Sequence, residues 1–125
     1  MSRILLVIGL ACVSVSAAAA PGDMKISTFL QKADALKAKG ILALASSDMG
    51  ILKAEGQAAG ETYRARIKSD DAKKLPPHSC PPAQARFKSD ELLAHFRSYT
   101  VVQRQQISVK TGYAELMKKR YPCKT

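Results

Sequence analysis

Few side chains in this chain are of the types that perform chemistry. The two histidines are His78, in a proline-rich segment, and His95, in a predicted helix. Neither has a cysteine, serine or acid at a recognised catalytic spacing, and the sequence contains no glycine-rich phosphate loop and no metal-binding motif. The sequence therefore predicts a protein that is not an enzyme and that uses no cofactor.

The acidic pairs Asp70–Asp71 and Asp90–Glu91 are the remaining candidates for acid–base chemistry. Adjacent residues on a helix point in different directions, so neither pair brings two carboxylates together. Charge stabilisation at helix ends is the simpler interpretation. Ser79 lies directly before a cysteine, and we interpret it as a turn residue and not as a nucleophile.

The first twenty residues have the pattern of a secretory signal peptide. Arg3 is their only charged residue, Ile4–Ala11 is apolar, and small residues follow. We expect cleavage near Ala19 or Ala20, which leaves one exported helical domain over residues 21–125. The apolar run is shorter than the about 20 residues that span a membrane, and no later segment is apolar enough to span one. Lipidation of Cys12, inside the signal, is an alternative to simple cleavage.

Cys80 and Cys123 are the cysteines of the mature chain. In an oxidising compartment two cysteines in a small domain usually pair. Closing a loop of about 44 residues stabilises the folded state by ~4 kcal/mol in the chain-entropy model. The alternatives are two free thiols or a metal site. Because these cysteines and His78 supply three ligands at most, we expect no metal.

The chain is strongly basic, with 20 lysine and arginine residues against 10 aspartate and glutamate residues. Loss of Arg3 with the signal leaves a net charge of +9. This excess favours anionic partners such as acidic proteins, lipopolysaccharide or membrane surfaces. An exported protein rarely meets nucleic acid, so we expect no nucleic-acid partner. Since the basic residues are spread along the chain, the alternative is that most of them only solvate the surface.

The apolar spacing predicts four helices and no sheet. The expected helices run from a cap at Ser27 to a stop at Gly40, from Ser47 or Asp48 to about Asp70, onward from a cap at Ser89, and onward from a cap at Ser108. We expect Ile41–Ala45 to be a buried turn of helix or packed connection, and Thr100–Ile107 to be a polar turn. The predicted fold is all-α, a small domain of four helices (five with the short turn) in which one disulfide staples the C-terminal helical hairpin.

The longest predicted helix carries a buried stripe. Its members recur at steps of three or four residues: Met49, Leu52, Gly56, Ala59, Tyr63 and Ile67. Gly56 and Gly60 form a smooth strip that would let another helix cross closely. The alternative is a slightly unstable helix whose glycines have no special use, since each costs about 1 kcal/mol relative to alanine.

Four prolines between residues 76 and 82 separate the N-terminal pair of helices from the C-terminal pair. Because proline stiffens the chain, this segment loses little entropy on binding. We therefore expect Leu75, Pro76, Pro77 and His78 to form a partner-binding surface, with Cys80 as its tether. The four tyrosines are alternative anchors for a partner, but their spacing places them on inward faces.

The chain contains several short motifs between its predicted glycine-rich helix and its end. They are Gly56–Tyr63, Cys80-Pro81-Pro82, Ser89–Leu93, Phe96–Tyr99 and the closing Tyr121-Pro122-Cys123. Together they resemble the Tai-like (Rap-type) immunity proteins. The resemblance covers most of the mature chain, although a cysteine that the family has in its earlier helix is missing, which leaves one disulfide.

This resemblance implies a small all-helical periplasmic protein that binds and blocks a peptidoglycan amidase toxin delivered by type VI secretion. Two other classes of function stay open. One is a periplasmic acid-stress holdase chaperone of the HdeA type, although this chain has few carboxylates to titrate. The other is an envelope-surface protein that binds an anionic polymer. Monomer and homodimer are both compatible with the sequence.

Overall fold

A computed structural model describes residues 20–124 of the chain. The expected signal peptide and Cys12 lie outside these residues. The elements are α1 (Ile26–Lys39), η1 (Gly40–Ala45), α2 (Ser47–Ala72), α3 (Ser89–Ser98), α4 (Val101–Gln106) and α5 (Val109–Arg120). Within residues 20–124 the only β-type pairing is an isolated bridge between Lys25 and Ser108. The predicted all-α fold is confirmed.

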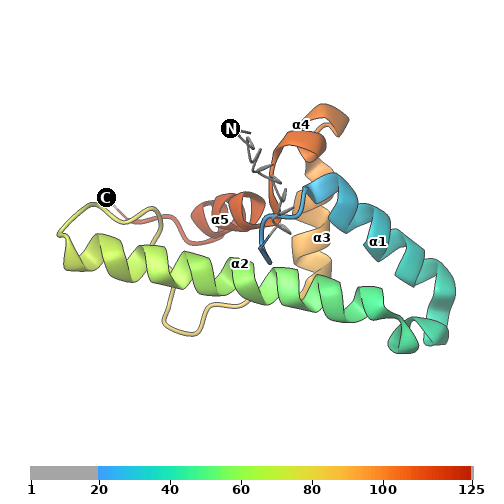
Figure 1. Cartoon of the computed structure of the whole chain (residues 1–125). Coiled ribbons are helices and arrows are strands. Elements are labelled where there is room, and N and C mark those ends of the chain that lie inside the picture. The colour runs from blue at the N-terminus through green and yellow to red at the C-terminus, as the bar shows by residue number, and fades with distance from the viewer. Residues whose placement is uncertain (1–19, 125) are drawn as a thin grey trace, which may run out of the picture.

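Helix α2 is the longest element, and the other helices are arranged around it (Figure 1). Its 26 residues give it a length of about 39 Å. Helix α5 lies beside the C-terminal half of α2 and runs in the same direction, while α1 connects to the start of α2 through η1. Helix α3 packs against α1 and α5, and α4 packs against α1. None of the helices between residues 20 and 124 is long and apolar enough to cross a membrane.

Phe96 of α3 is the centre of the core and is completely buried. Its ring meets Phe29 of α1 edge-on at a centroid distance of 5.4 Å. Gly112 of α5 makes room for this packing, because a Cβ atom there would lie 2.7 Å from Ile26 Cδ1 and 2.9 Å from Phe96 Cε1. The close approach between helices therefore depends on a glycine of α5 that the sequence did not single out.

The predicted glycine strip of α2 is only half confirmed. A Cβ atom at Gly60 would lie 3.3 Å from the Tyr113 hydroxyl of α5, so a helix does pass closely there. At Gly56 the same Cβ atom would meet nothing within 4 Å. The interpretation is wrong for Gly56, because this residue faces the open groove described below and not a helix.

Hydrogen bonds join the start of the described chain to α2 and to α5. Gly22, with φ of 97°, occupies a turn that requires the left-handed region, and its amide donates to the buried carboxylate of Glu55 in α2 at 2.5 Å. The carbonyls of Gly22 and Met24 accept hydrogen bonds from the first amides of α5, at 3.0 and 2.8 Å. These bonds satisfy donors that the first turn of a helix leaves unpaired.

Two of the expected helix caps are displaced. Helix α1 begins at Ile26 and α3 begins at Ser89, so neither Ser27 nor Ser89 precedes its helix. The amide of Ile26 bonds instead to the carbonyl of Ile107, at 3.0 Å, which fixes the start of α1 without a side-chain cap. Gly40 and Ser108 end α1 and cap α5 as predicted, and α2 continues to Ala72.

The segment Thr100–Ile107 is not simply a turn, because it contains α4. The Thr100 hydroxyl accepts from the Gln103 amide at 3.2 Å, and the Gln103 side chain accepts from the Thr100 amide at 2.9 Å. This reciprocal pair is a capping box, which satisfies two donors at once and allows a six-residue helix to form.

The Ile41–Ala45 segment was expected to be buried, and this expectation is wrong. It forms the 3₁₀ helix η1, in which only Ala43 is buried while Ile41, Leu42 and Leu44 are exposed. A 3₁₀ helix has three residues per turn, so every third side chain shares a face. Because Ala43 faces inward, the side chains on the other two faces of the helix, those of Ile41, Leu42 and Leu44, face the solvent.

The end of α2 provides a first testable prediction. Lys74 has φ of 57°, and the amide of Leu75 bonds back to the carbonyl of Asp70 at 2.9 Å, as in a Schellman motif. A side chain in this left-handed conformation costs about 1 kcal/mol, so Lys74→Gly should stabilise the protein by about that amount. Urea unfolding measures the change. Lys74→Ala removes the same charge but keeps the Cβ atom, and equal stability of the two variants would contradict the prediction.

Candidate protein-binding segment

The proline-rich segment after α2 presents one part of its surface and buries another. Leu75 is 51% exposed, and Pro76 and Pro77 are also exposed. The His78 side chain is only 12% exposed, and Ser79 is fully buried. The structure therefore places three of the four predicted contact residues on the surface, whereas His78 faces the interior.

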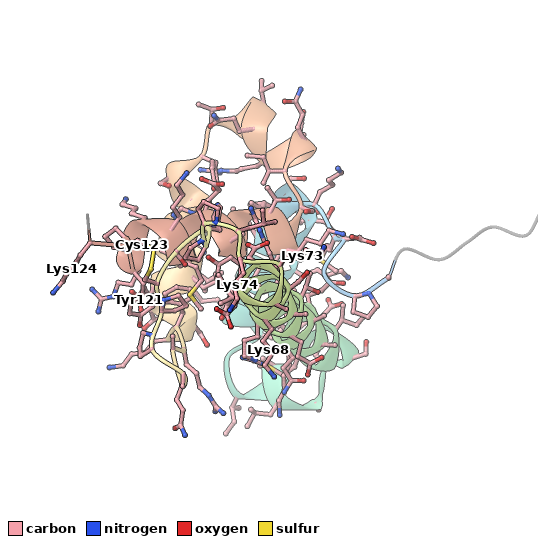
Figure 2. The ribbon with its side chains drawn as sticks, turned by 90° about the vertical axis from the view of Figure 1, so that its left-hand side faces the viewer. Lys68, Lys73, Lys74, Tyr121, Cys123 and Lys124 are labelled. Atoms are coloured by element: carbon pink, nitrogen blue, oxygen red, sulfur yellow. A yellow bond between two sulfur atoms is a disulfide. The ribbon has the colours of Figure 1, made fainter. Side chains whose placement is uncertain are left out.

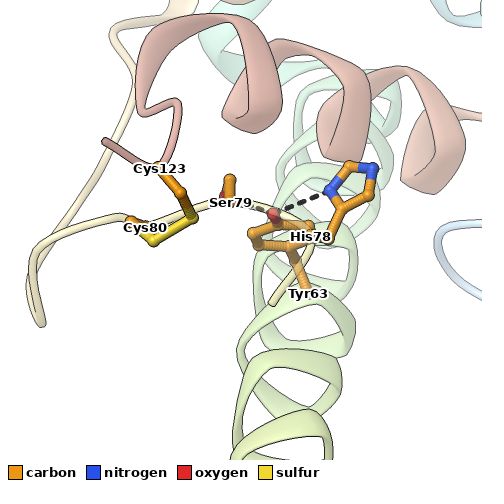
Figure 3. Close-up of a disulfide and its surroundings, with 5 residues drawn as sticks. All are labelled: Tyr63, His78, Ser79, Cys80 and Cys123. Atoms are coloured by element: carbon orange, nitrogen blue, oxygen red, sulfur yellow. Dashed lines mark hydrogen bonds between the residues drawn. A yellow bond between two sulfur atoms is a disulfide. The ribbon is translucent and has the colours of Figure 1, made fainter. Parts of the chain in front are cut away.

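A buried polar cluster holds this segment against α2 (Figure 3). The hydroxyl of Tyr63 lies 3.0 Å from His78 Nδ1 and is also hydrogen-bonded to Ser79 Oγ. Tyr63 belongs to the predicted buried stripe and is itself buried. One side chain of α2 thus fixes two consecutive residues of the segment.

The disulfide fixes the other end of the segment. Cys80 and Cys123 are bonded with a Cα–Cα distance of 4.9 Å, which confirms the predicted pairing. The Cys80 amide also donates to the carbonyl of Tyr121 at 2.8 Å. An ion pair of 3.5 Å between Glu91 and Arg120 shows that the start of α3 and the end of α5 meet near this staple.

Burial and nearby positive charge keep His78 neutral at pH 7. Burial lowers the pKa of His78, and the positive charge of Arg66 lowers it further, while Glu115 acts in the opposite direction from 3.9 Å. Burial raises the pKa of Tyr63, so its hydroxyl keeps its proton. We assign the bonds accordingly: Ser79 donates to Tyr63, Tyr63 donates to Nδ1 of His78, and Nε2–H faces Glu115.

This cluster anchors the segment to α2. Ser79 Oγ is buried and bonded to Tyr63, so no substrate can reach it while the segment is in place. In the part of the chain that the structure describes, no group of three or more His, Cys, Asp or Glu side chains is placed to hold a metal ion. The chemistry available here is hydrogen bonding within the protein.

The surface around the anchored segment is basic (Figure 2). Lys68 lies near the end of α2, Lys73 and Lys74 follow it, and Lys124 comes directly after Cys123. All four lysines are exposed. This disulfide end of the molecule therefore presents the exposed residues Leu75–Pro77 together with four exposed lysines, and the acidic residues Asp70 and Asp71 lie in the same stretch of chain.

A concave region lies between α1, α2 and α3. It is an open groove of about 900 Å³ whose apolar lining includes Phe29, Leu52, Phe87, Leu92, Leu93 and Tyr113. Lys53, Arg64 and Arg86 also line it. No local pattern predicts this groove, because its lining comes from elements that are far apart along the chain.

The two histidines predict a stability that falls on acidification. Burial lowers the pKa of both His78 and His95, and the charge of Lys119 adds to the effect at His95. A base whose folded pKa lies below its unfolded value stabilises the protein above the unfolded value of about 6.5, and this contribution is lost as the pH falls below it. Each histidine contributes a slope of at most about 1.4 kcal/mol per pH unit.

Urea unfolding between pH 7 and pH 5 measures this slope. The wild type should lose stability over this range, and His78→Asn, which retains an acceptor for Tyr63 but cannot titrate, should lose less. Stability that is constant or that rises on acidification over this range would contradict the assignment of neutral, buried imidazoles.

No family model, curated protein or solved structure significantly matches the chain.

Proposed function

We propose that this chain is a non-catalytic binding protein of the periplasm, of the Tai-like immunity type, that blocks a cell-wall amidase by occupying its cleft. The observation that supports the proposal best is the fixed, exposed segment Leu75–Pro77. It is held on one side by the end of α2 and on the other by the Tyr63 cluster and the disulfide.

Preorganisation is the physical basis of this proposal. A flexible loop loses conformational entropy when it binds, which weakens the complex. Here two prolines, a buried hydrogen-bonded pair and a covalent bond have already removed that freedom. The exposed Leu75 supplies an apolar contact at the start of the segment.

Charge supports a partner with an acidic surface. Lys68, Lys73, Lys74 and Lys124 are exposed at the same end of the molecule (Figure 2), and complementary charge accelerates association and selects against basic partners. The disulfide supports an oxidising compartment, where such bonds persist.

Capture from a cell-envelope extract at physiological ionic strength tests the proposal. Immobilised wild-type protein should retain a cell-wall hydrolase, and Leu75→Glu should retain at least tenfold less, because a buried charge replaces an apolar contact. Leu42→Glu is the matched control, since Leu42 is also an exposed leucine, at 72% against 51% for Leu75, but belongs to η1 at the opposite end of α2. Absence of any hydrolase, or equal capture by both variants, would contradict the proposal.

A further inference from the structure

The turn between α1 and α2 carries the most unusual surface of the described chain. Ile41, Leu42 and Leu44 of η1 are 84%, 72% and 76% exposed. Met49 and Ile51, in the first turns of α2, are also exposed. We name these five residues the hairpin tip. Large apolar patches on the surface of a small protein usually mark a binding site.

The charge around the hairpin tip is positive. The acidic residues nearby are already paired, Asp48 with Lys32 at 2.8 Å and Asp34 with Arg97 at 2.6 Å. Three exposed lysines flank η1: Lys37 and Lys39 in the last turn of α1, and Lys53 in α2. In the described chain none of these three lysines forms an ion pair, so the hairpin tip presents aliphatic side chains bordered by uncompensated cations.

We infer that the hairpin tip docks onto the surface of an anionic lipid bilayer. Ile41, Leu42 and Leu44 would enter the boundary between headgroups and acyl chains, and the lysines would contact headgroup phosphates. This combination of a small apolar face and flanking lysines is what binds a protein to a membrane surface without spanning it. The long lysine side chains can extend to the headgroups while their stems stay in apolar contact.

The composition of the hairpin tip favours a lipid surface over a protein partner. Protein interfaces concentrate their binding energy in tryptophan, tyrosine and arginine, and the hairpin tip has none of these. It also projects from the end of the molecule, where α1 turns back into α2 (Figure 1). A second copy of the chain would bring a further set of lysines against these lysines.

This surface is separate from the one proposed to bind the amidase. The hairpin tip and the segment Leu75–Pro77 lie at opposite ends of α2, about 39 Å apart. A molecule docked through the hairpin tip would therefore hold its disulfide end away from the membrane, free for a partner. The inference does not depend on the identity of that partner.

Vesicle sedimentation with the purified, oxidised protein tests the inference. Vesicles of phosphatidylcholine with one third phosphatidylglycerol should bind the wild type, and vesicles of phosphatidylcholine alone should bind it at least tenfold more weakly. Leu42→Glu and the double variant Lys37→Glu, Lys39→Glu should each weaken binding to the anionic vesicles at least tenfold. All three substituted residues are exposed, so the variants retain the fold. Leu75→Glu is the matched control and should bind like the wild type.

Three results would overturn the inference. The first is equal binding to anionic and neutral vesicles, and the second is unchanged binding by Leu42→Glu. The third is a wild type that does not bind vesicles and is dimeric by light scattering, while Leu42→Glu is monomeric. In that case a second copy of the chain would cover the hairpin tip. Failure to capture a hydrolase leaves all three readouts unaffected, so the two proposals can fail separately.

Discussion

Replacing both Cys80 and Cys123 with serine should lower the free energy of unfolding by about 4 kcal/mol. The bond joins residues 43 positions apart, and in the chain-entropy model a loop of this size restricts the unfolded chain by that amount. A domain of this size has a total stability of about 5–15 kcal/mol, so the loss would remove between about a quarter and four fifths of it. Urea unfolding at 25 °C measures the difference.

Two comparisons separate the disulfide from its surroundings. Wild-type protein unfolded under reducing conditions should match the double serine variant, because both lack the same constraint. Pro122→Ala alters the residue beside Cys123 without breaking the bond, and it should stay within about 1 kcal/mol of the wild type. A double serine variant that stays equally close to the wild type would show that the bond does not stabilise the fold.

Phe96→Ala should destabilise the protein by about 3–5 kcal/mol, the usual range for removing a buried aromatic side chain. Phe96 is completely buried and contacts Phe29 edge-on, and the space above Gly112 is already filled by its ring and by Ile26. The helices cannot close the resulting cavity easily, because these four residues belong to three different helices, α1, α3 and α5.

Phe87 provides the matched control for this prediction. It has the same ring, packed against Tyr113 at 5.3 Å and against Tyr121 at 6.3 Å, but it is only partly buried. Phe87→Ala should therefore cost clearly less than Phe96→Ala, on the order of 1–2 kcal/mol. Equal costs, or a cost below about 1 kcal/mol for Phe96→Ala, would show that the core is not centred on α3.

Apolar periodicity predicted most of the helical structure. Gly40 ends α1, Ser108 caps α5, and Ala59 and Tyr63 lie on a buried face of α2, because these features depend on residues within a few turns of one another. Helix α4 was missed although Thr100 and Gln103 have the spacing of a capping box. A search for that pair would have found it.

The parts that could not be predicted depend on contacts between distant residues. The run Ile41–Ala45 is apolar enough for a core, and only its 3₁₀ geometry at the end of a hairpin leaves most of it in solvent. The position of α5 beside α2 requires Gly60 to meet Tyr113, which are 53 positions apart, and no local pattern encodes that pairing.

The candidate site was predicted in outline only. The expected export of the chain, and the two cysteines that remain when the expected signal is removed, predicted the Cys80–Cys123 bond, which the structure contains. His78 was grouped with the exposed residues because it follows two prolines, yet it bonds to Tyr63 in the interior. The sequence did not predict that Tyr63 anchors the segment, since the place of Tyr63 in the stripe of α2 indicated only that it was buried.

Residues 75–80 should be rigid in the free protein, with Leu75–Pro77 exposed and Ser79 buried, and nitrogen-15 relaxation of the backbone amides tests this directly. The amides of Leu75, His78, Ser79 and Cys80 report on the segment, since the two prolines between them have none. Order parameters near 0.85, equal to those of α5, are the expected result. Values below about 0.6 in the oxidised protein would show a mobile loop and would contradict the account.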